Sequence, residues 1–155
     1  MGILTWLEGT GFADWVRTSA SGYPLMITCH AIGMGIMVGL AVLLDFRLLG
    51  WFPGISYKSL HRFLGVAWVG FGINFLSGFG LFAAQATMFA THVMFLIKIG
   101  FVFLGAITAA LLQSAVGRDY ATWGATVPSN VRAIAIASIA FWTIAITAGR
   151  LTAYI

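Results

Sequence analysis

The amino-acid sequence predicts an all-α integral membrane protein, a four-helix bundle preceded by a short amphipathic segment. Of its 155 residues, 61% are hydrophobic and only 8% are charged, whereas soluble domains carry about 25% charged residues. A helix needs about 20 mostly apolar residues to cross a bilayer, and the chain has room for four such stretches. A water-soluble fold of this size could not cover so much apolar surface, so we expect one membrane domain over residues 1–155.

The first 21 residues predict a segment that lies in the membrane interface. Its apolar residues, including Trp6 and Trp15, alternate with the charged residues Glu8, Asp14 and Arg17. Such amphipathic segments lie along the bilayer surface with their apolar side toward the lipid. The segment does not look like a signal peptide, because no basic residue precedes its first apolar residues.

Four apolar stretches predict four membrane-spanning helices. They cover residues of about 23–44, 63–83, 89–112 and 131–154. The connection between the second and third stretches is short, so these two helices are expected to be antiparallel neighbours. Small residues within the spans predict either faces of close helix packing or room for a flat cofactor: Ala31, Gly35 and Gly39 in the first span, Gly65 and Gly72 in the second, and Gly100 in the third.

Basic residues predict the orientation. Five of them flank the spans on one side: Arg47, Lys58, Arg62, Arg118 and Arg132. Arg17 and Arg150 fall on the other side. Because cytoplasmic loops are enriched in Lys and Arg, we expect a multi-pass protein of a bacterial inner membrane with both termini in the periplasm. The charges are dispersed along the chain, which indicates membrane topology and no nucleic-acid partner.

Ionisable residues inside the spans mark the candidate site, because such groups are costly in a bilayer. His30, His92, Lys98 and Arg150 are predicted to gather toward the periplasmic side, on three different helices. Asn74, near the middle of the second span, is expected to donate a hydrogen bond to another helix.

This cluster is suited to haem b. The iron needs one or two imidazoles and the propionates need cationic partners. His30 and His92 are the candidate metal ligands, and Lys98 and Arg150 are the candidate partners of the propionates. The two histidines differ in depth by roughly 10 Å of helical rise, which a tilted helix would reduce. No Cys-x-x-Cys-His string occurs, which excludes ordinary c-type haem attachment.

Two other interpretations stay open. Copper(I) is favoured by thioether and imidazole ligands, and such residues follow one another on two spans: Met26, His30, Met34 and Met37, with Cys29 adjacent, and Met88, His92 and Met94. Methionines at helical spacing are also common core residues. Without a cofactor, His30 would hydrogen-bond to a neighbouring helix, while Lys98 and Arg150 would extend toward the interface.

The string His30-x(14)-Asp45-Phe46-Arg47-Leu48-Leu49-Gly50, a lysine early in the third span (Lys98) and the ending Ala148-Gly149-Arg150-Leu151-Thr152-Ala153-Tyr154 together resemble an uncharacterised family of small bacterial four-helix membrane proteins. The resemblance covers essentially the whole chain and implies that His30, Asp45, Arg47, Lys98 and Arg150 are characteristic polar positions. His92 departs from the asparagine associated with that family. The architecture is more loosely similar to copper-resistance membrane proteins and to b-type cytochromes.

We therefore expect a small haem-b membrane subunit that transfers electrons between a periplasmic partner and the quinone pool. The alternatives are a copper-binding or copper-transporting membrane protein and a cofactor-free accessory subunit of a larger membrane complex. No Walker A string and no His-Glu-x-x-His motif occurs, so the sequence gives no sign of these nucleotide or zinc chemistries. Asp45 and Arg47 are expected to cap the first helix or to pair with a loop.

Overall fold

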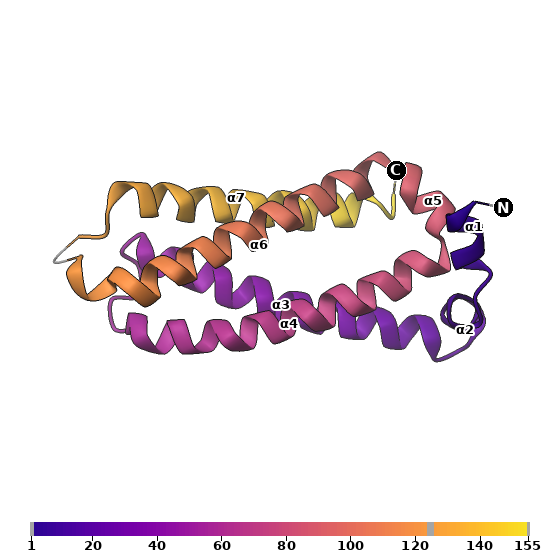
Figure 1. Ribbon diagram of the computed structural model, residues 1–155, viewed down its shortest axis with the longest axis horizontal. Helices are drawn as coiled ribbons and strands as arrows, with labels where there is room; N and C mark the ends of the chain where they lie inside the picture. The colour runs from indigo at the N-terminus through magenta and orange to yellow at the C-terminus, as the bar shows by residue number, and fades with distance from the viewer. Residues whose placement is uncertain (1, 124–125, 155) are drawn as a thin grey trace.

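Four long α-helices form an elongated bundle in the computed structural model, which describes residues 2–123 and 126–154 (Figure 1). The long helices are α3 (Gly22–Leu48), α4 (Tyr57–Ala84), α6 (Val93–Asp119) and α7 (Ser129–Leu151). The short elements are α1 (Ile3–Glu8), α2 (Gly11–Thr18), α5 (Ala86–Thr91) and the 3-10 turn η1 (Tyr120–Thr122). These described ranges contain no β-strand, so the all-α fold class is confirmed. All four long helices are long and apolar enough to cross a membrane.

Three of the long helices are longer than the apolar stretches that predict them, whereas α7 begins two residues before its predicted stretch and ends three residues before the end of it, at Leu151. α3, α4 and α6 continue into their charged flanks, because backbone hydrogen bonding does not stop where hydropathy falls. The third predicted span, 89–112, is divided. His92 has an extended backbone with φ −80° and ψ 112°, and it separates α5 from α6.

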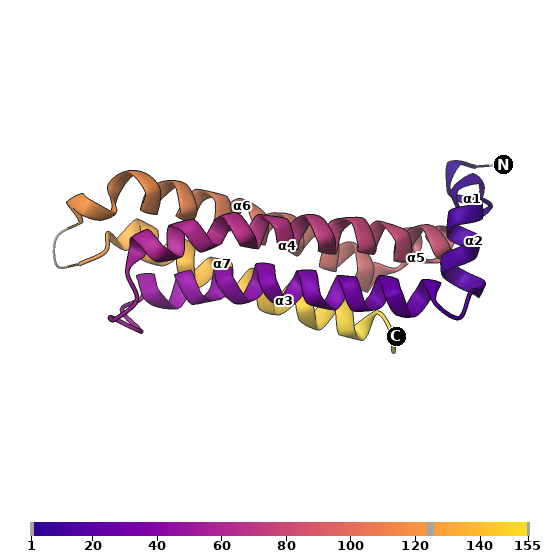
Figure 2. The same cartoon turned by 90° about the horizontal axis from the view of Figure 1, so that it is seen from below.

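The bundle consists of two helical hairpins. α3 packs mainly against α4, and α6 packs mainly against α7, whereas α4 and α6 meet only sparsely. Gly33 and Gly70 allow α3 and α4 to approach closely, since a Cβ at Gly33 would lie 2.6 Å from the Gly70 carbonyl oxygen. The two hairpins lie side by side, and both termini lie at the same end as α5 (Figures 1 and 2). We call this end the termini end and the other the loop end.

The glycine packing face expected from sequence is wrong. A Cβ at Gly35 or Gly39 would meet no atom of the described chain within 4 Å. The same result holds for the other glycines singled out in the spans, Gly65, Gly72 and Gly100. The buried face of α3 lies further round the helix, through Gly33, Met37 and Ala41.

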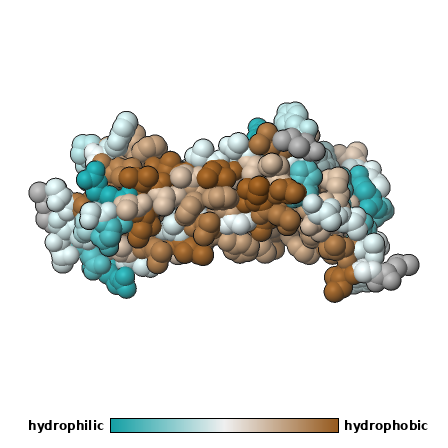
Figure 3. Space-filling model, turned by 90° about the horizontal axis from the view of Figure 1, so that it is seen from above, coloured by the Kyte–Doolittle hydropathy of each residue, from teal (hydrophilic) through white to brown (hydrophobic). Residues whose placement is uncertain are grey.

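On the face seen in Figure 3, the surface is apolar along most of the bundle, and polar residues gather toward its two ends. Large apolar side chains of the long helices are exposed, such as Leu76 at 71% and Val69 at 64%. Contiguous apolar surface on this scale is unusual for a protein in water.

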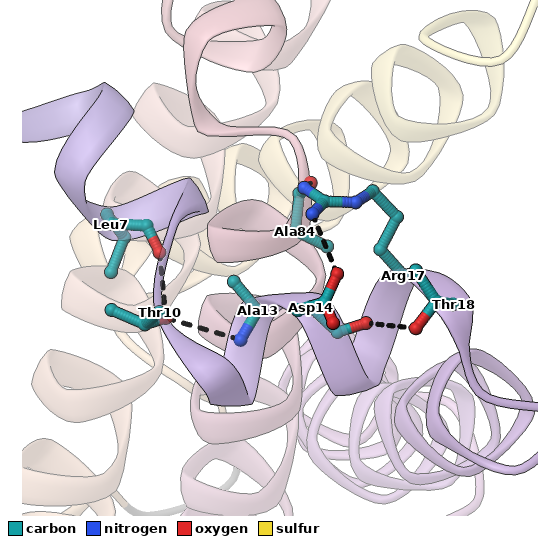
Figure 4. Close-up of polar contacts among 7 residues, drawn as sticks. All are labelled: Leu7, Thr10, Ala13, Asp14, Arg17, Thr18 and Ala84. Atoms are coloured by element: carbon teal, nitrogen blue, oxygen red, sulfur yellow. Dashed lines mark hydrogen bonds and ion pairs between the residues drawn. The ribbon is translucent and has the colours of Figure 1, made fainter.

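α2 lies across the termini end of the bundle (Figure 2). Ala13 and Val16 on α2 are fully buried against the bundle. Arg17 donates a hydrogen bond to the Ala84 carbonyl at 3.3 Å and pairs with Asp14 at 3.0 Å (Figure 4). These contacts hold the N-terminal segment onto the end of α4.

α1 is attached through Glu8. Its carboxylate accepts hydrogen bonds from the Thr87 backbone N–H at 2.8 Å and from the Thr87 hydroxyl at 2.7 Å. These bonds favour the ionised form and lower the pKa of Glu8 from its usual value. Ile3 and Trp6 on α1 stay exposed, which gives the segment an apolar outer side.

Candidate functional site

His30 on α3 is held by a reciprocal pair of hydrogen bonds to α4. Its Nδ1 lies 2.9 Å from the Asn74 carbonyl oxygen, and the Asn74 side-chain amide donates to the His30 carbonyl at 2.8 Å. A carbonyl oxygen only accepts, so Nδ1 carries the hydrogen and, in the neutral ring, Nε2 carries the lone pair. The expected interhelical hydrogen bond from Asn74 is confirmed.

Lys98 on α6 reaches the other nitrogen of the same ring. Its Nζ lies 3.5 Å from His30 Nε2. The stem of Lys98 lies near Gly149 of α7, where an added Cβ would be 3.2 Å from Lys98 Cδ. A chain of donors therefore runs from Lys98 to His30 and on to the Asn74 carbonyl, and it joins three of the four long helices.

A small, partly open cavity of about 20 Å³ lies beside this chain. All four long helices line it, and its principal side chains are His30, Asn74, Lys98, Trp142, Met34 and Met37. This volume suits a water molecule or one polar group of a larger ligand. The lining contains no carboxylate, so Lys98 has no acidic side chain beside it in the cavity.

The structure brings together two of the four predicted site residues. His30 and Lys98 are neighbours, whereas His92 and Arg150 do not line the cavity. His92 lies at the junction of α5 and α6, six positions before Lys98, which is roughly 9 Å of helical rise. Its Nδ1 is buried without a hydrogen-bond partner among the residues described. Arg150 is exposed near the end of α7.

The predicted copper ligands are also divided. Met34 and Met37 line the cavity with His30. Met26 does not, and its sulfur packs instead against α4, where a Cβ at Gly80 would be 2.9 Å away. In the described part of the chain, no three His, Cys, Asp or Glu residues are grouped so that they could hold a metal ion.

The side chains of Asp45 and Arg47 make different contacts and do not share one role. Arg47 donates to the Ile55 carbonyl at 2.7 Å and lies over the Tyr57 ring at 4.3 Å, so it braces the loop after α3. Asp45 is only 1% exposed and lies beside Ser138 of α7. Of the two expected roles, pairing with a loop holds for Arg47 through Ile55, while neither residue forms a salt bridge within the described residues, where the single ion pair joins Arg17 and Asp14.

Sequence reasoning missed the contribution of α7. Ser138 and Trp142 are one helical turn apart and both are buried. The signal was present in the sequence, as two polar side chains at i and i+4 within an apolar span. Trp142 is seated on Gly105 of α6, where a Cβ would lie 2.7 Å from its ring.

A second hollow, of about 240 Å³, lies between α6 and α7. Its lining includes no ionisable side chain, and the hydroxyls of Thr143 and Thr147 donate to carbonyls of their own helix. This groove is suited to an apolar chain, so the polar chemistry is concentrated at His30.

No protein-family model, no curated protein and no solved structure matches this chain.

Chemically, the His30–Lys98 pair combines an imidazole held by Asn74 with the amine of a long side chain. Either nitrogen can hold the proton between them, because imidazole Nε2 accepts and the lysine amine donates. Lys98 can also donate directly to an oxygen atom that enters the cavity, and His30 can do so once the shared proton has moved to Nε2. The pair is therefore equipped to bind an oxygen acceptor and to give it a proton.

Proposed function

We propose that this protein is a small membrane subunit at which a periplasmic redox partner exchanges electrons directly with the quinone pool, and that His30 and Lys98 bind one oxygen of the quinone head-group. The observation that carries this proposal is the 3.5 Å approach of Lys98 Nζ to His30 Nε2 beside a cavity of about 20 Å³. The donor Lys98, and the imidazole that can share its proton, lie beside a space that accepts one oxygen-sized group.

Quinone chemistry matches these donors. A quinone takes up two electrons and two protons to become a quinol, so its oxygens need proton donors as they are reduced. The electrons would come from the periplasmic partner, and the protons would pass through Lys98 and His30. A general acid acts within hydrogen-bond reach of the atom that it protonates. A quinone also reaches the bundle from the lipid phase, which suits the apolar outer surface.

The membrane location is part of the proposal. Four helices of sufficient length and an apolar outer band support insertion into a bacterial inner membrane. The exposed Ile3 and Trp6 support an interfacial position for α1. The basic residues at the loop end support a periplasmic location of the termini end. A C-terminal reporter that is active only in the cytoplasm should stay inactive.

Haem b stays a prediction, and the closed bundle does not fit it at His30. A porphyrin is many times larger than a cavity of about 20 Å³, and Lys98 lies where iron would approach Nε2. His92 is also too far along α6 to complete a bis-histidine site without rearrangement. Haem would need the two hairpins to separate.

Copper(I) is the second candidate. His30, Met34 and Met37 line one ion-sized cavity, and the Nδ1–H bond to a carbonyl is the second contact that orients many metal-binding histidines. An ammonium group 3.5 Å from Nε2 opposes a cation there. Elemental analysis of Met34→Leu, with Met26→Leu as the matched control, tests this candidate.

Binding of a short-chain quinone to the purified protein tests the main proposal. Lys98→Met and His30→Ala should weaken binding strongly, because Lys98 is the donor to the quinone oxygen and His30 holds Lys98 in place and shares its proton. Lys58→Met and His61→Ala, which change the same residue types at the loop end, should bind like the wild type. Equal binding by Lys98→Met and Lys58→Met would refute the quinone site. A protein that binds no quinone, haem or copper would support a cofactor-free accessory subunit.

A further inference from the structure

Besides His30 and Lys98, the ionisable residue Asp45 is buried in the half of the bundle nearer the loop end. Asp45 is 1% exposed, and its Oδ2 has no hydrogen-bond partner in residues 2–123 and 126–154. The Ser138 hydroxyl lies against the same carboxyl, is fully buried, and makes no hydrogen bond of ordinary length and angle within the described residues. Arg47, the nearest basic residue in sequence, is committed to the loop after α3 through Ile55.

The unpartnered polar atoms continue toward the His30–Lys98 pair. Trp142 follows Ser138 by one turn of α7, is 4% exposed, and has an indole N–H without a partner in the described chain. The same Trp142 lines the cavity that contains His30 and Lys98. Asp45, Ser138 and Trp142 thus form a line of buried polar groups that ends at the candidate site.

Unpaired polar groups are costly to bury, and buried water is the usual partner of such groups. A water molecule needs two or more polar partners to be held. Neighbouring members of this line can supply them, since Asp45 and Ser138 lie side by side and the indole N–H of Trp142 can donate to a water oxygen.

We propose that this line is a proton path through the bundle, from Asp45 to Lys98. The Asp45 carboxyl gives a proton to an adjoining water, the Ser138 hydroxyl and the waters pass one proton onward, and the neutral amine of Lys98 accepts it. Asp45 then regains a proton from the loop end, where α3 finishes one turn later at Leu48. Trp142 only donates, so it positions water without relaying protons.

The path adds a proton source to the proposed function, and it rests on that function because its final proton acceptor is the quinone. Lys98 would pass the proton to the quinone oxygen, so protons would be taken from the loop end while the quinone is reduced near the termini end. With the loop end in the cytoplasm, quinone reduction would then consume cytoplasmic protons.

Proton flux into liposomes tests the path without quinone, because an imposed potential can drive the proton from Lys98 out through the partly open cavity when no quinone is present to take it. The purified protein is reconstituted with a pH-sensitive dye inside, and a potassium diffusion potential drives protons inward. Wild-type vesicles should acidify faster than protein-free vesicles. Asp45→Asn should reduce the flux to the protein-free rate, while Asp119→Asn, which changes an exposed carboxylate, should not. Wild-type flux no faster than that of empty vesicles would overturn the path, as would normal flux in Asp45→Asn.

A second pair of variants keeps the path testable if Asp45→Asn misfolds. Ser138→Ala removes one hydroxyl from the line and should slow the flux, whereas Ser114→Ala, on the exposed side of α6, should not. If Asp45→Asn fails to assemble, this pair decides the matter. Failure of the path and failure of the quinone site give different results. If the wild type binds quinone but Ser138→Ala has normal flux, only the path is removed. If Ser138→Ala loses flux but the wild type binds no quinone, only the quinone site is removed.

Discussion

The imidazole of His30 lies directly against Gly78 of the neighbouring helix. A Cβ at Gly78 would be 2.9 Å from His30 Cε1 and 3.1 Å from Nδ1. The ring is therefore confined between α4, through Gly78 and Asn74, and Lys98 of α6.

Gly78→Ala should displace this ring and weaken the hydrogen bond from Nδ1 to the Asn74 carbonyl. NMR of the imidazole nitrogens should show changed signals for His30, and quinone binding should fall. Gly72→Ala on the same helix is the control, because a Cβ there would meet nothing in the described chain within 4 Å. Unchanged His30 signals in Gly78→Ala would contradict the tight confinement of the ring.

Gly33→Ala should strongly destabilise the α3–α4 hairpin. The added Cβ would lie 2.6 Å from both the Asn74 nitrogen and the Gly70 carbonyl oxygen, and these backbone atoms cannot move without separating the helices. We expect a loss of about 1–3 kcal/mol or more in the free energy of unfolding, measured in detergent. Gly35→Ala, which faces open space, should instead stabilise the helix by up to about 1 kcal/mol.

Attachment of α1 should depend on pH through Glu8. The pKa of Glu8 is lowered in the folded chain, chiefly by the Thr87 backbone N–H and then by its hydroxyl. The contribution of this contact is therefore fully present above the ordinary pKa of glutamate and is lost as pH falls through the lowered folded-state value. Hydrogen exchange of α1 should rise with acidification across that range. Glu8→Gln should remove most of this dependence, whereas Asp14→Asn should keep it.

A haem site, if His30 forms one, has a distinct pattern across the three histidines. His30→Ala should abolish the Soret band while the helices still form. His92→Ala should do as much for a bis-histidine iron and less for an iron with one strong ligand. His61→Ala should leave the band intact, because His61 lies near the loop end against Gly117 of α6. A normal band in His30→Ala would remove haem ligation by His30.

The sequence predicts the four long helices well, because apolar stretches of this length have few alternatives. It also places His30 and Lys98 at similar depth, toward the same end of the bundle. It could not predict which faces of the helices meet. Gly35 and Gly33 are two positions apart, yet only Gly33 contacts α4. The rotation of α3 about its own axis decides which of the two faces α4, and it follows from side-chain packing across the whole interface.

The depth of Asp45 was equally hard to predict. Its position near a charged loop suggested a surface role, and its neighbour Ser138 lies 93 positions later in the chain. Such a contact depends on how α7 returns beside α3. His92 shows a related difficulty, since a break between α5 and α6 interrupts an apolar stretch that hydropathy alone reads as continuous.

The division into two hairpins has a consequence for biosynthesis. In each hairpin the closest contacts join long helices that follow one another in the chain, so each hairpin can complete its packing soon after it leaves the ribosome. The contact between His30 and Lys98 crosses from one hairpin to the other. The protein's chemistry would therefore be assembled last, when two separately inserted halves meet. Two fragments made from separate messages, divided near His92, should still associate in one membrane and restore that contact.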